Sequence, residues 1–201
     1  MKTIMILGAG ILQLPAIKKA LKMGLRVVAV DMDANAVGMK IDGVIPEVIS
    51  TIDTPAIVDA ARRLRVDGVM TLASDMPMRS VAAVAKALNL SGISEETALK
   101  ATSKAEMRKA LSENGVPIPK FFVVSSKEEY LRAVSEFDSE LMVKPADNSG
   151  SRGIFKVSDL SDKTLIDKAY EYSKSFSRGG ELVIEEYMSG PEVSVETLTV
   201  D

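Results

Sequence analysis

The sequence predicts an α/β fold in two parts, a parallel, doubly wound domain followed by a smaller α+β domain. Three short, continuous apolar runs are typical of strands buried on both faces of a parallel sheet. They are residues 3–7, 27–30 and 68–72. Helical periodicity separates them at residues 11–23, 55–64 and 78–88, as in right-handed βαβ units. Thr54, just before Pro55, is the expected N-cap of the second helix.

The pattern changes at Ser91, so we expect one domain over residues 1–92 and a second over 93–201. Polar helices are expected at residues 94–101 and 103–114, the latter ending at Gly115. Further helices are expected at residues 126–137 and 165–175. Strands are expected at residues 120–124, 141–144, 154–157, 182–186 and 193–200. Because the last strand has no following segment to cover it, we interpret the chain as part of a longer, truncated protein.

The composition excludes several functional classes. The chain has no cysteine and no histidine, which removes disulfides, thiolate metal sites, Ser-His-Asp hydrolases and most zinc enzymes. A net charge of −3 argues against a nucleic-acid partner. No apolar run approaches the roughly 20 residues of a membrane helix. We therefore expect a cytoplasmic protein whose chemistry depends on lysine, arginine, carboxylates and backbone groups.

A glycine turn follows the first strand and opens the first helix. Gly8 and Gly10 with Asp31, at the end of the second strand, have the arrangement of a dinucleotide-binding domain. Gln13 occupies the position of the third glycine, where its side chain would enter the path of a pyrophosphate. We favour a tight turn in a Rossmann-like scaffold that binds no NAD, with nicotinamide binding as the alternative.

Polar residues also follow the third apolar run. Ser74 and Asp75 are candidate substrate contacts, as is Gly10, because ligands bind at the carboxyl ends of parallel strands. Both residue types also cap helices well, and we favour a capping role at the helix that starts near Pro77.

The strongest local signal is the segment MVKPADNSGSRGI, where a strand ends near Lys144 and another resumes at Ile154. Gly150 and Gly153 permit positive φ, and successive exposed N–H groups can form a nest for phosphate oxygens. Lys144 supplies a matching positive charge. We favour phosphate binding over a flexible hairpin.

A polar hinge follows the apolar strand in ELVIEEYMSGPE. Backbone groups of an extended segment can recognise adenine, and Glu192 could accept hydrogen bonds from ribose hydroxyls. Taken alone, the segment is better interpreted as an acidic turn between two strands.

These motifs occur together and in order, and with them the sequence resembles the ATP-grasp superfamily, in its carbamoyl-phosphate-synthase-like and biotin-carboxylase-like branch. MILGAGILQLPAIKKALKMGLRVVAVDMDANAVG is similar to the pre-ATP-grasp domain, and SKAEMRKALSENGVPIPK to the entry of the ATP-grasp fold. MVKPADNSGSRGI is similar to the phosphate loop and ELVIEEYMSGPEVSVE to the adenine hinge. The resemblance places a small ATP-binding subdomain at about residues 119–187.

The resemblance implies roles for particular residues. Lys104 and Lys144 would hold nucleotide phosphates, Glu185 and Met188 would bind adenine through their main chains, and Glu192 would bind the ribose. Glu186 and Tyr187 lie in the same hinge. A phosphate loop would close over the nucleotide, with Asn148, Ser149, Gly150, Ser151, Arg152 and Gly153.

The resemblance also implies an activity for the whole protein. An ATP-grasp ligase activates a carboxylate or bicarbonate as an acyl phosphate, using ATP and Mg²⁺, and an amine or similar nucleophile then attacks it. The family's magnesium ligands come from a C-terminal region with no counterpart before Asp201, so we expect no metal ligands and no independent activity here. No catalytic residue is assigned. Partners would be small-molecule substrates, and a homodimer is compatible with the family. A non-catalytic nucleotide-binding module is a further alternative.

Overall fold

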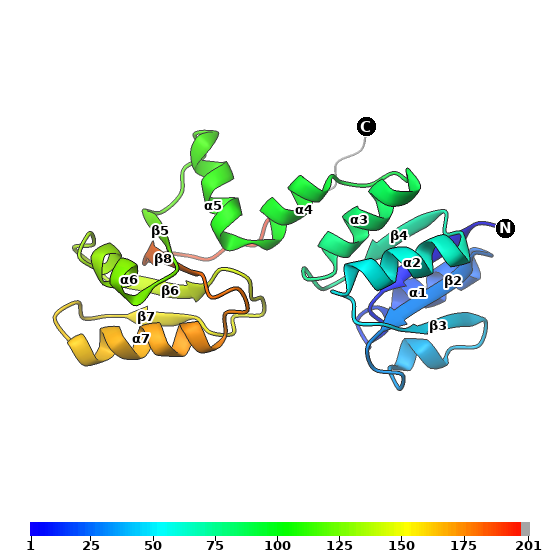
Figure 1. The fold of residues 1–201 in the computed structure, drawn as a ribbon, viewed down its shortest axis with the longest axis horizontal. Helices are drawn as coiled ribbons and strands as arrows, with labels where there is room; N and C mark the ends of the chain where they lie inside the picture. Colours follow the sequence, from blue (N-terminus) through cyan, green and yellow to red (C-terminus); the bar gives the residue numbers. More distant parts are fainter. Residues whose placement is uncertain (198–201) are drawn as a thin grey trace. The chain divides into compact units, whose positions relative to one another are not determined.

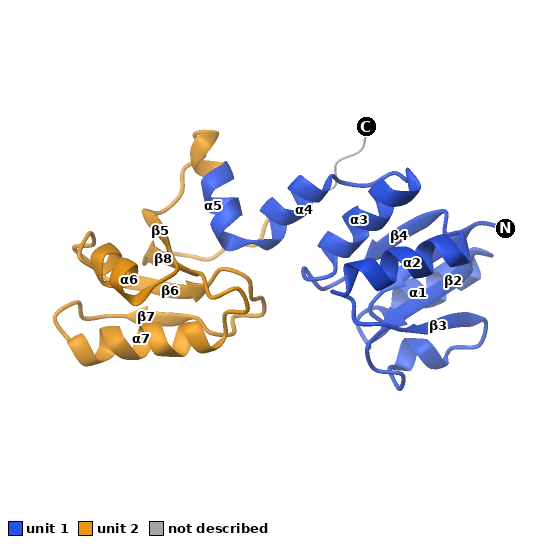
Figure 2. Ribbon diagram, viewed as in Figure 1, with its two compact units in different colours: residues 1–110 blue, residues 111–201 orange. Residues whose placement is uncertain are grey.

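A computed structural model describes residues 1–197 (Figure 1). The chain forms two compact units, residues 1–110 and the residues from Leu111 onward (Figure 2). Each unit has its own four-stranded sheet. Among the described residues, no helix has the length and apolar character needed to cross a bilayer.

The first unit is a parallel sheet with helices on both faces, which confirms the predicted doubly wound domain. Its strands, in spatial order, are β3 (Val44–Val48), β2 (Arg26–Asp31), β1 (Thr3–Leu7) and β4 (Gly68–Thr71). One face carries α2 (Thr54–Leu64) and α3 (Met78–Leu88), and the other carries α1 (Leu14–Lys22) and the short 3-10 helix η1 (Val37–Lys40). Because the strand order reverses between β1 and β4, the loops after these strands flank the ligand crevice typical of such sheets.

Two local predictions in this unit need correction. Strand β3 was not expected, because Pro46 interrupts its apolar run; β3 is an edge strand, where a missing N–H is tolerated. Helix α2 is capped by Asp53, not Thr54: the Asp53 carboxylate accepts a hydrogen bond from the Ala56 N–H at 3.2 Å. Thr54 is the first helical residue, and its hydroxyl instead contacts Ser80 at 2.8 Å.

Two further helices lead out of the first sheet. Helix α4 (Glu95–Thr102) is capped by Ser94 and packs against α3. Helix α5 (Lys104–Glu113) follows directly and carries the boundary between the two units. Both lie within two residues of their predicted ranges.

The second unit is an antiparallel sheet covered on one face by two helices, which confirms the predicted α+β part. Its strands, in spatial order, are β5 (Phe121–Val124), β8 (Leu182–Glu186), β6 (Leu141–Pro145) and β7 (Phe155–Val157). Helices α6 (Lys127–Val134) and α7 (Lys163–Ser175) pack on this sheet around a core that includes Leu141, Val143, Leu182 and Ile184. Because side chains alternate along a strand, Lys144 and Glu185 lie on the opposite face.

The predicted strand at residues 193–200 is wrong for residues 193–197, and residues 198–200 lie outside the described residues. Residues 193–197 form no strand, and Val193 and Val195 are 82% and 79% exposed. The preceding strand, β8, is already paired on both sides with β5 and β6, so the segment after it has no adjacent sheet edge to join.

Tyr130 ties α6 to α7 in the core of the second unit, and it makes the stability of the protein sensitive to alkaline pH. Its hydroxyl donates to the Ile166 carbonyl at 2.9 Å. Burial, and to a lesser degree the charge of Asp167, raises the pKa of this phenol. The unfolded chain loses the phenol proton near pH 10, whereas the folded chain keeps it. The contribution is therefore complete below about pH 10 and is lost as the pH rises above it.

We expect the free energy of unfolding of the wild type to fall above about pH 10, by up to about 1.4 kcal/mol for each pH unit from this group. Tyr130→Phe should lose about 1 kcal/mol at pH 8, where only the hydrogen bond is removed, and should show a shallower decline above pH 10. Urea unfolding followed by circular dichroism from pH 8 to 11 measures both effects. Equal pH slopes in the two proteins would contradict the assignment.

Candidate functional site

The candidate site is centred on a partly buried ion pair on the face of the second sheet opposite α6 and α7. The Lys144 Nζ atom lies 2.5 Å from Oε2 of Glu185. The Glu185 side chain is 4% exposed and that of Lys144 is 21% exposed. Strand register explains the pairing: β6 and β8 are antiparallel neighbours in which Lys144 stands opposite Val183, so Glu185 is its diagonal neighbour on the same face.

The predicted phosphate loop directly follows Lys144 and is anchored at its base by Asp147. The Asp147 carboxylate accepts hydrogen bonds from the backbone N–H groups of Arg178 and Gly179, at 3.1 and 2.5 Å, and from the Ser177 hydroxyl at 3.3 Å. The Asn148 amide donates to the Phe176 carbonyl at 3.2 Å. These contacts tie the start of the loop to the segment between α7 and β8. Asp147 was not among the predicted site residues.

The tip of the loop presents backbone donors to solvent. Gly150 and Ser151 have positive φ, 67° and 57°, and both are exposed. Within residues 1–197, the backbone N–H groups of Gly150, Ser151, Arg152 and Gly153 donate no hydrogen bond. Ser151 is a non-glycine residue in the left-handed region, a strain that is concentrated at ligand sites. Consecutive unpaired N–H groups beside a lysine match the predicted phosphate nest.

The hinge after β8 leaves one backbone donor available. The N–H of Glu186 donates to Lys120 at 2.9 Å and that of Tyr187 donates to Glu140 at 3.0 Å. The N–H of Met188, by contrast, has no acceptor among the described residues, and the residue is 66% exposed. Glu192 is exposed a few residues beyond. This is the pattern that recognition of adenine by the Met188 main chain requires.

The Tyr187 side chain is held away from a role in adenine recognition. The Lys156 ammonium lies 3.7 Å from the centre of the Tyr187 ring and also pairs with Glu140 at 3.0 Å. The ring is thereby held against β7.

The remaining predicted residues belong to the first unit. Lys104 is half-buried at the first position of α5. Gly10 lies in the loop after β1, and Ser74 and Asp75 lie, exposed, in the loop after β4. The two loops are joined by Gln13, whose side-chain Nε2 donates to the Leu72 carbonyl at 2.6 Å.

The capping role favoured for Ser74 and Asp75 is wrong. Helix α3 begins at Met78 with Pro77 at the N-cap position and no side-chain cap. Asp75 contributes its backbone carbonyl, which accepts from the Met78 N–H at 3.0 Å, whereas its carboxylate lies two residues before the N-cap position. A substrate role for these residues and for Gly10 stays a prediction.

The glycine turn after β1 is filled and braced by side chains of the protein itself. A Cβ atom at Gly8 would lie 3.0 Å from the Gln13 side chain, which fills the space above the turn. The carboxylate of Asp31 accepts from the Ala9 N–H at 2.8 Å and from the Asp33 N–H at 3.0 Å. Asp31 therefore braces the turn with one of its oxygens and the following loop with the other.

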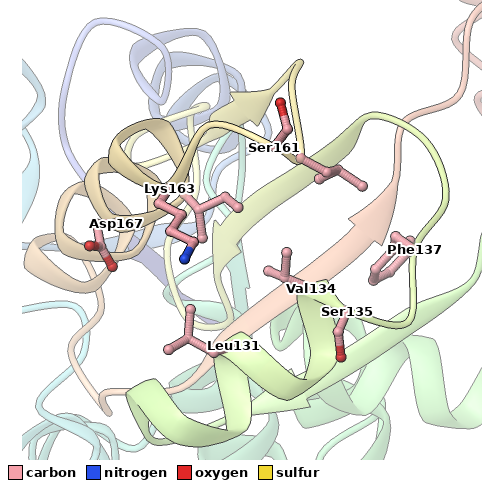
Figure 3. A pocket seen from close by; sticks show the side chains of 9 residues that line it. Leu131, Val134, Ser135, Phe137, Ser161, Lys163 and Asp167 are labelled. Carbon is pink, nitrogen blue, oxygen red and sulfur yellow. The ribbon is translucent and has the colours of Figure 1, made fainter.

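A cavity of about 600 Å³ opens between α6 and α7, on the helix side of the second sheet (Figure 3). Its floor belongs to the core of the unit and its rim is polar, and none of the predicted site residues lines it. The rim side chains, Ser135, Ser161, Lys163 and Asp167, are exposed. Asp167 is paired with Lys127 at 3.1 Å. Because these polar groups lie on the rim and do not converge over the floor, the opposite face is the better candidate site.

Comparison with known proteins supplies the family. The profile described as "Phosphoribosylglycinamide synthetase, ATP-grasp (A) domain" matches residues 102–201. The chain belongs to the ATP-grasp superfamily. Its fold is that of the N-terminal half of ATP-grasp enzymes. The biotin carboxylase domain of 2-oxoglutarate carboxylase from Hydrogenobacter thermophilus, solved with MgADP, ADP and bicarbonate, superposes with a TM-score of 0.73 at 18% identity. That match covers 93% of this ATP-grasp chain and 44% of the solved one.

Curated relatives of this ATP-grasp chain include formate-dependent phosphoribosylglycinamide formyltransferases. The protein from Maridesulfovibrio salexigens is 25% identical over 190 residues, and that from Synechococcus sp. strain CC9605 is 30% identical over 195 residues. Each match covers 93% of this chain and 47% of the relative. The chain therefore spans about half the length of the curated relatives that it matches.

Proposed function

We propose that the chain is the nucleotide-binding part of an ATP-grasp ligase. Its second unit would hold ATP on the face opposite α6 and α7. The Lys144–Glu185 pair carries the proposal, because it holds a lysine side chain that is 21% exposed beside a loop in which the N–H groups of residues 150–153 have no acceptor within residues 1–197. A triphosphate supplies anionic oxygens that can accept hydrogen bonds from the ammonium and from these N–H groups.

Each predicted residue has a place in this proposal. Lys144 contacts the phosphates, and Lys104 is the second proposed cation. Asn148, Ser149, Gly150, Ser151, Arg152 and Gly153 form the loop that closes over them. The main chains of Glu185 and Met188 bind adenine within the hinge that also contains Glu186 and Tyr187, and Glu192 accepts from the ribose.

The reaction of the whole protein is proposed as activation of a carboxylate, or of bicarbonate, to an acyl phosphate that an amine or similar nucleophile then attacks. The named relatives support this class, since they are formate-dependent phosphoribosylglycinamide formyltransferases. Gly10, Ser74 and Asp75 are the proposed substrate contacts in the first unit. Phosphoryl transfer depends mainly on positioning and on cations, so this chain's part is to align the phosphates.

Magnesium would enter with the nucleotide, because Mg²⁺ is commonly held by substrate phosphates together with one or two carboxylates. Within residues 1–197 no group of three or more acidic side chains is arranged to hold a metal ion. We assign no magnesium ligand to the described residues.

A nicotinamide-binding Rossmann protein is the rival proposal, since the first unit has the required strand order and an acidic residue at the end of β2. Gln13 argues against it. Its side chain occupies the space over the glycine turn, where a pyrophosphate would have to approach the backbone.

Calorimetric titration of the chain with ATP, ADP and NAD in parallel separates the two proposals. We expect ATP and ADP to bind and NAD to give no heat of binding. Binding of NAD without ADP would overturn the proposed function in favour of the rival. Acyl phosphate chemistry is then tested on the full-length protein, as ADP release that depends on an added carboxylate.

A further inference from the structure

We propose that Asp147 is a positioning residue of the phosphate loop. Its carboxylate fixes the loop on the turn between α7 and β8, and so holds the backbone donors of residues 150–153 ready for nucleotide phosphates. This inference rests on the proposed function and extends it. The family resemblance gives roles to residues 148–153 and none to Asp147. In the structure Asp147 is half-buried and accepts hydrogen bonds from three consecutive residues, 177–179.

An acidic side chain at this place requires an explanation, because an uncompensated carboxylate beside the loop would repel the phosphates. The backbone N–H groups of Arg178 and Gly179 meet the Asp147 carboxylate at 3.1 and 2.5 Å. Successive N–H groups form a concave anion site, and hydrogen bonds to an ionised acceptor are stronger than neutral ones. The turn thus binds the protein's own carboxylate, and the negative charge of Asp147 is compensated before a nucleotide arrives.

Both ends of the loop are fixed to the segment that contains this turn. Asp147 directly follows Ala146, whose N–H donates to the carbonyl of the residue before β8 at 3.1 Å. At the other end, Gly153 lies so close to Phe176 that a Cβ atom at residue 153 would be 2.5 Å from the Phe176 Cβ. The exposed tip spans the distance between these two fixed points. The position of Asp147 therefore helps to determine where the N–H groups of the tip lie.

Removal of the carboxylate tests this role. In Asp147→Ala the first end of the loop loses its anchor, so a nucleotide must order the loop as it binds, at a cost in affinity. We expect ADP binding to weaken about tenfold. Binding of adenosine should stay unchanged, because adenosine has no phosphate for the loop to hold. Calorimetric titration of the chain with both compounds measures the two affinities.

The matched control is Asp162→Ala, at the N-cap of α7. The Asp162 carboxylate also accepts from two backbone N–H groups, those of Thr164 and Leu165 at 2.9 and 3.1 Å. It lies at the end of α7 opposite to the turn that holds Asp147. Both substitutions should lower the urea midpoint of the second unit, since each leaves two N–H groups without their carboxylate. Only Asp147→Ala should weaken ADP binding.

A conservative replacement tests whether the contact itself matters. Asp147→Asn keeps one of the two acceptor oxygens and should restore part of the ADP affinity that Asp147→Ala loses. It also carries the comparison if the alanine variant does not fold. Equal weakening of ADP and adenosine, or an equal loss of ADP affinity in Asp162→Ala, would show a general loss of stability and overturn the inference. Unchanged ADP affinity without the carboxylate would overturn it as well.

A second readout needs no nucleotide. Arg152 is exposed in the loop, and trypsin cleaves a segment that can leave its folded position. Cleavage after Arg152, followed by mass spectrometry, should be several-fold faster in Asp147→Ala than in the wild type, and unchanged in Asp162→Ala. Unchanged cleavage in Asp147→Ala would refute the positioning role even if ADP fails to bind. Faster cleavage in that variant, together with no ADP binding by the wild type, would refute only the proposed function.

Discussion

Replacing Lys144 by methionine is expected to weaken ADP binding by about 1.5–3 kcal/mol, the range for a hydrogen bond to a charged group. Methionine keeps the length of the side chain and removes its charge. The control is Lys127→Met, which removes an exposed lysine from the helix side of the same unit and should leave ADP affinity unchanged. Calorimetry on both variants measures the difference. Unchanged ADP affinity in a folded Lys144→Met protein would remove this residue from the site.

The same substitution should also lower the stability of the second unit by about 3 kcal/mol, because it removes one charged partner of a buried carboxylate. All four tyrosines lie in this unit and the chain has no tryptophan, so tyrosine fluorescence during urea unfolding reports on it. Lys144→Met combined with Glu185→Leu should recover most of the stability, since an apolar pair replaces an ionic one. It should not recover ADP binding. The double variant would then show that the contribution of this residue pair to stability is distinct from its contribution to ADP affinity.

Local sequence patterns were sufficient for most of the scaffold. The runs at β1, β2 and β4 are short, continuous and apolar, a pattern typical of strands in a doubly covered sheet. Helix α6 could be recognised for a different reason, because Ser126 and Glu129 form a capping box in the structure. Strand β3 could not be predicted, since an edge strand with a proline has neither the continuity nor the alternation that marks a strand.

The candidate site, like the scaffold, has one part that local sequence predicts and another that it does not. Lys144 and the glycines of the phosphate loop form a compact segment whose composition is visible in the sequence. The contacts that organise this segment join residues far apart in the chain: Glu185 is 41 residues from Lys144, and Gly179 is 32 residues from Asp147. They depend on the pairing of β6 with β8, which no local period encodes. Asp147 could have been noticed in the sequence as an acidic residue inside a loop predicted to bind phosphate. Because a carboxylate repels phosphate, such a residue must have a structural role.

Substitution of Gly153 by alanine is expected to destabilise the second unit strongly, whereas the same change at Gly150 is not. Both glycines have positive φ, 79° and 67°, so each substitution incurs the left-handed penalty of about 1–2 kcal/mol. Only Gly153 is tightly enclosed. A Cβ atom there would lie 2.5 Å from Cβ of Phe176 and 2.6 Å from Cγ of Pro145, while nothing lies within 4 Å of one at Gly150.

We therefore expect Gly153→Ala to lose about 3 kcal/mol of unfolding free energy or more, the sum of left-handed strain and overpacking against groups that cannot rotate away. Gly150→Ala should lose about 1 kcal/mol and serves as the matched control for backbone strain alone. Urea midpoints from tyrosine fluorescence give both values. The two substitutions also distinguish the fixed end of the phosphate loop from its tip. Gly153 fixes the end of the loop against Phe176, after α7, and against β6, whereas Gly150 stays exposed at the tip. Equal destabilisation by the two substitutions would mean that the loop end can move aside, and that the anchor at Gly153 is not a fixed point of the site.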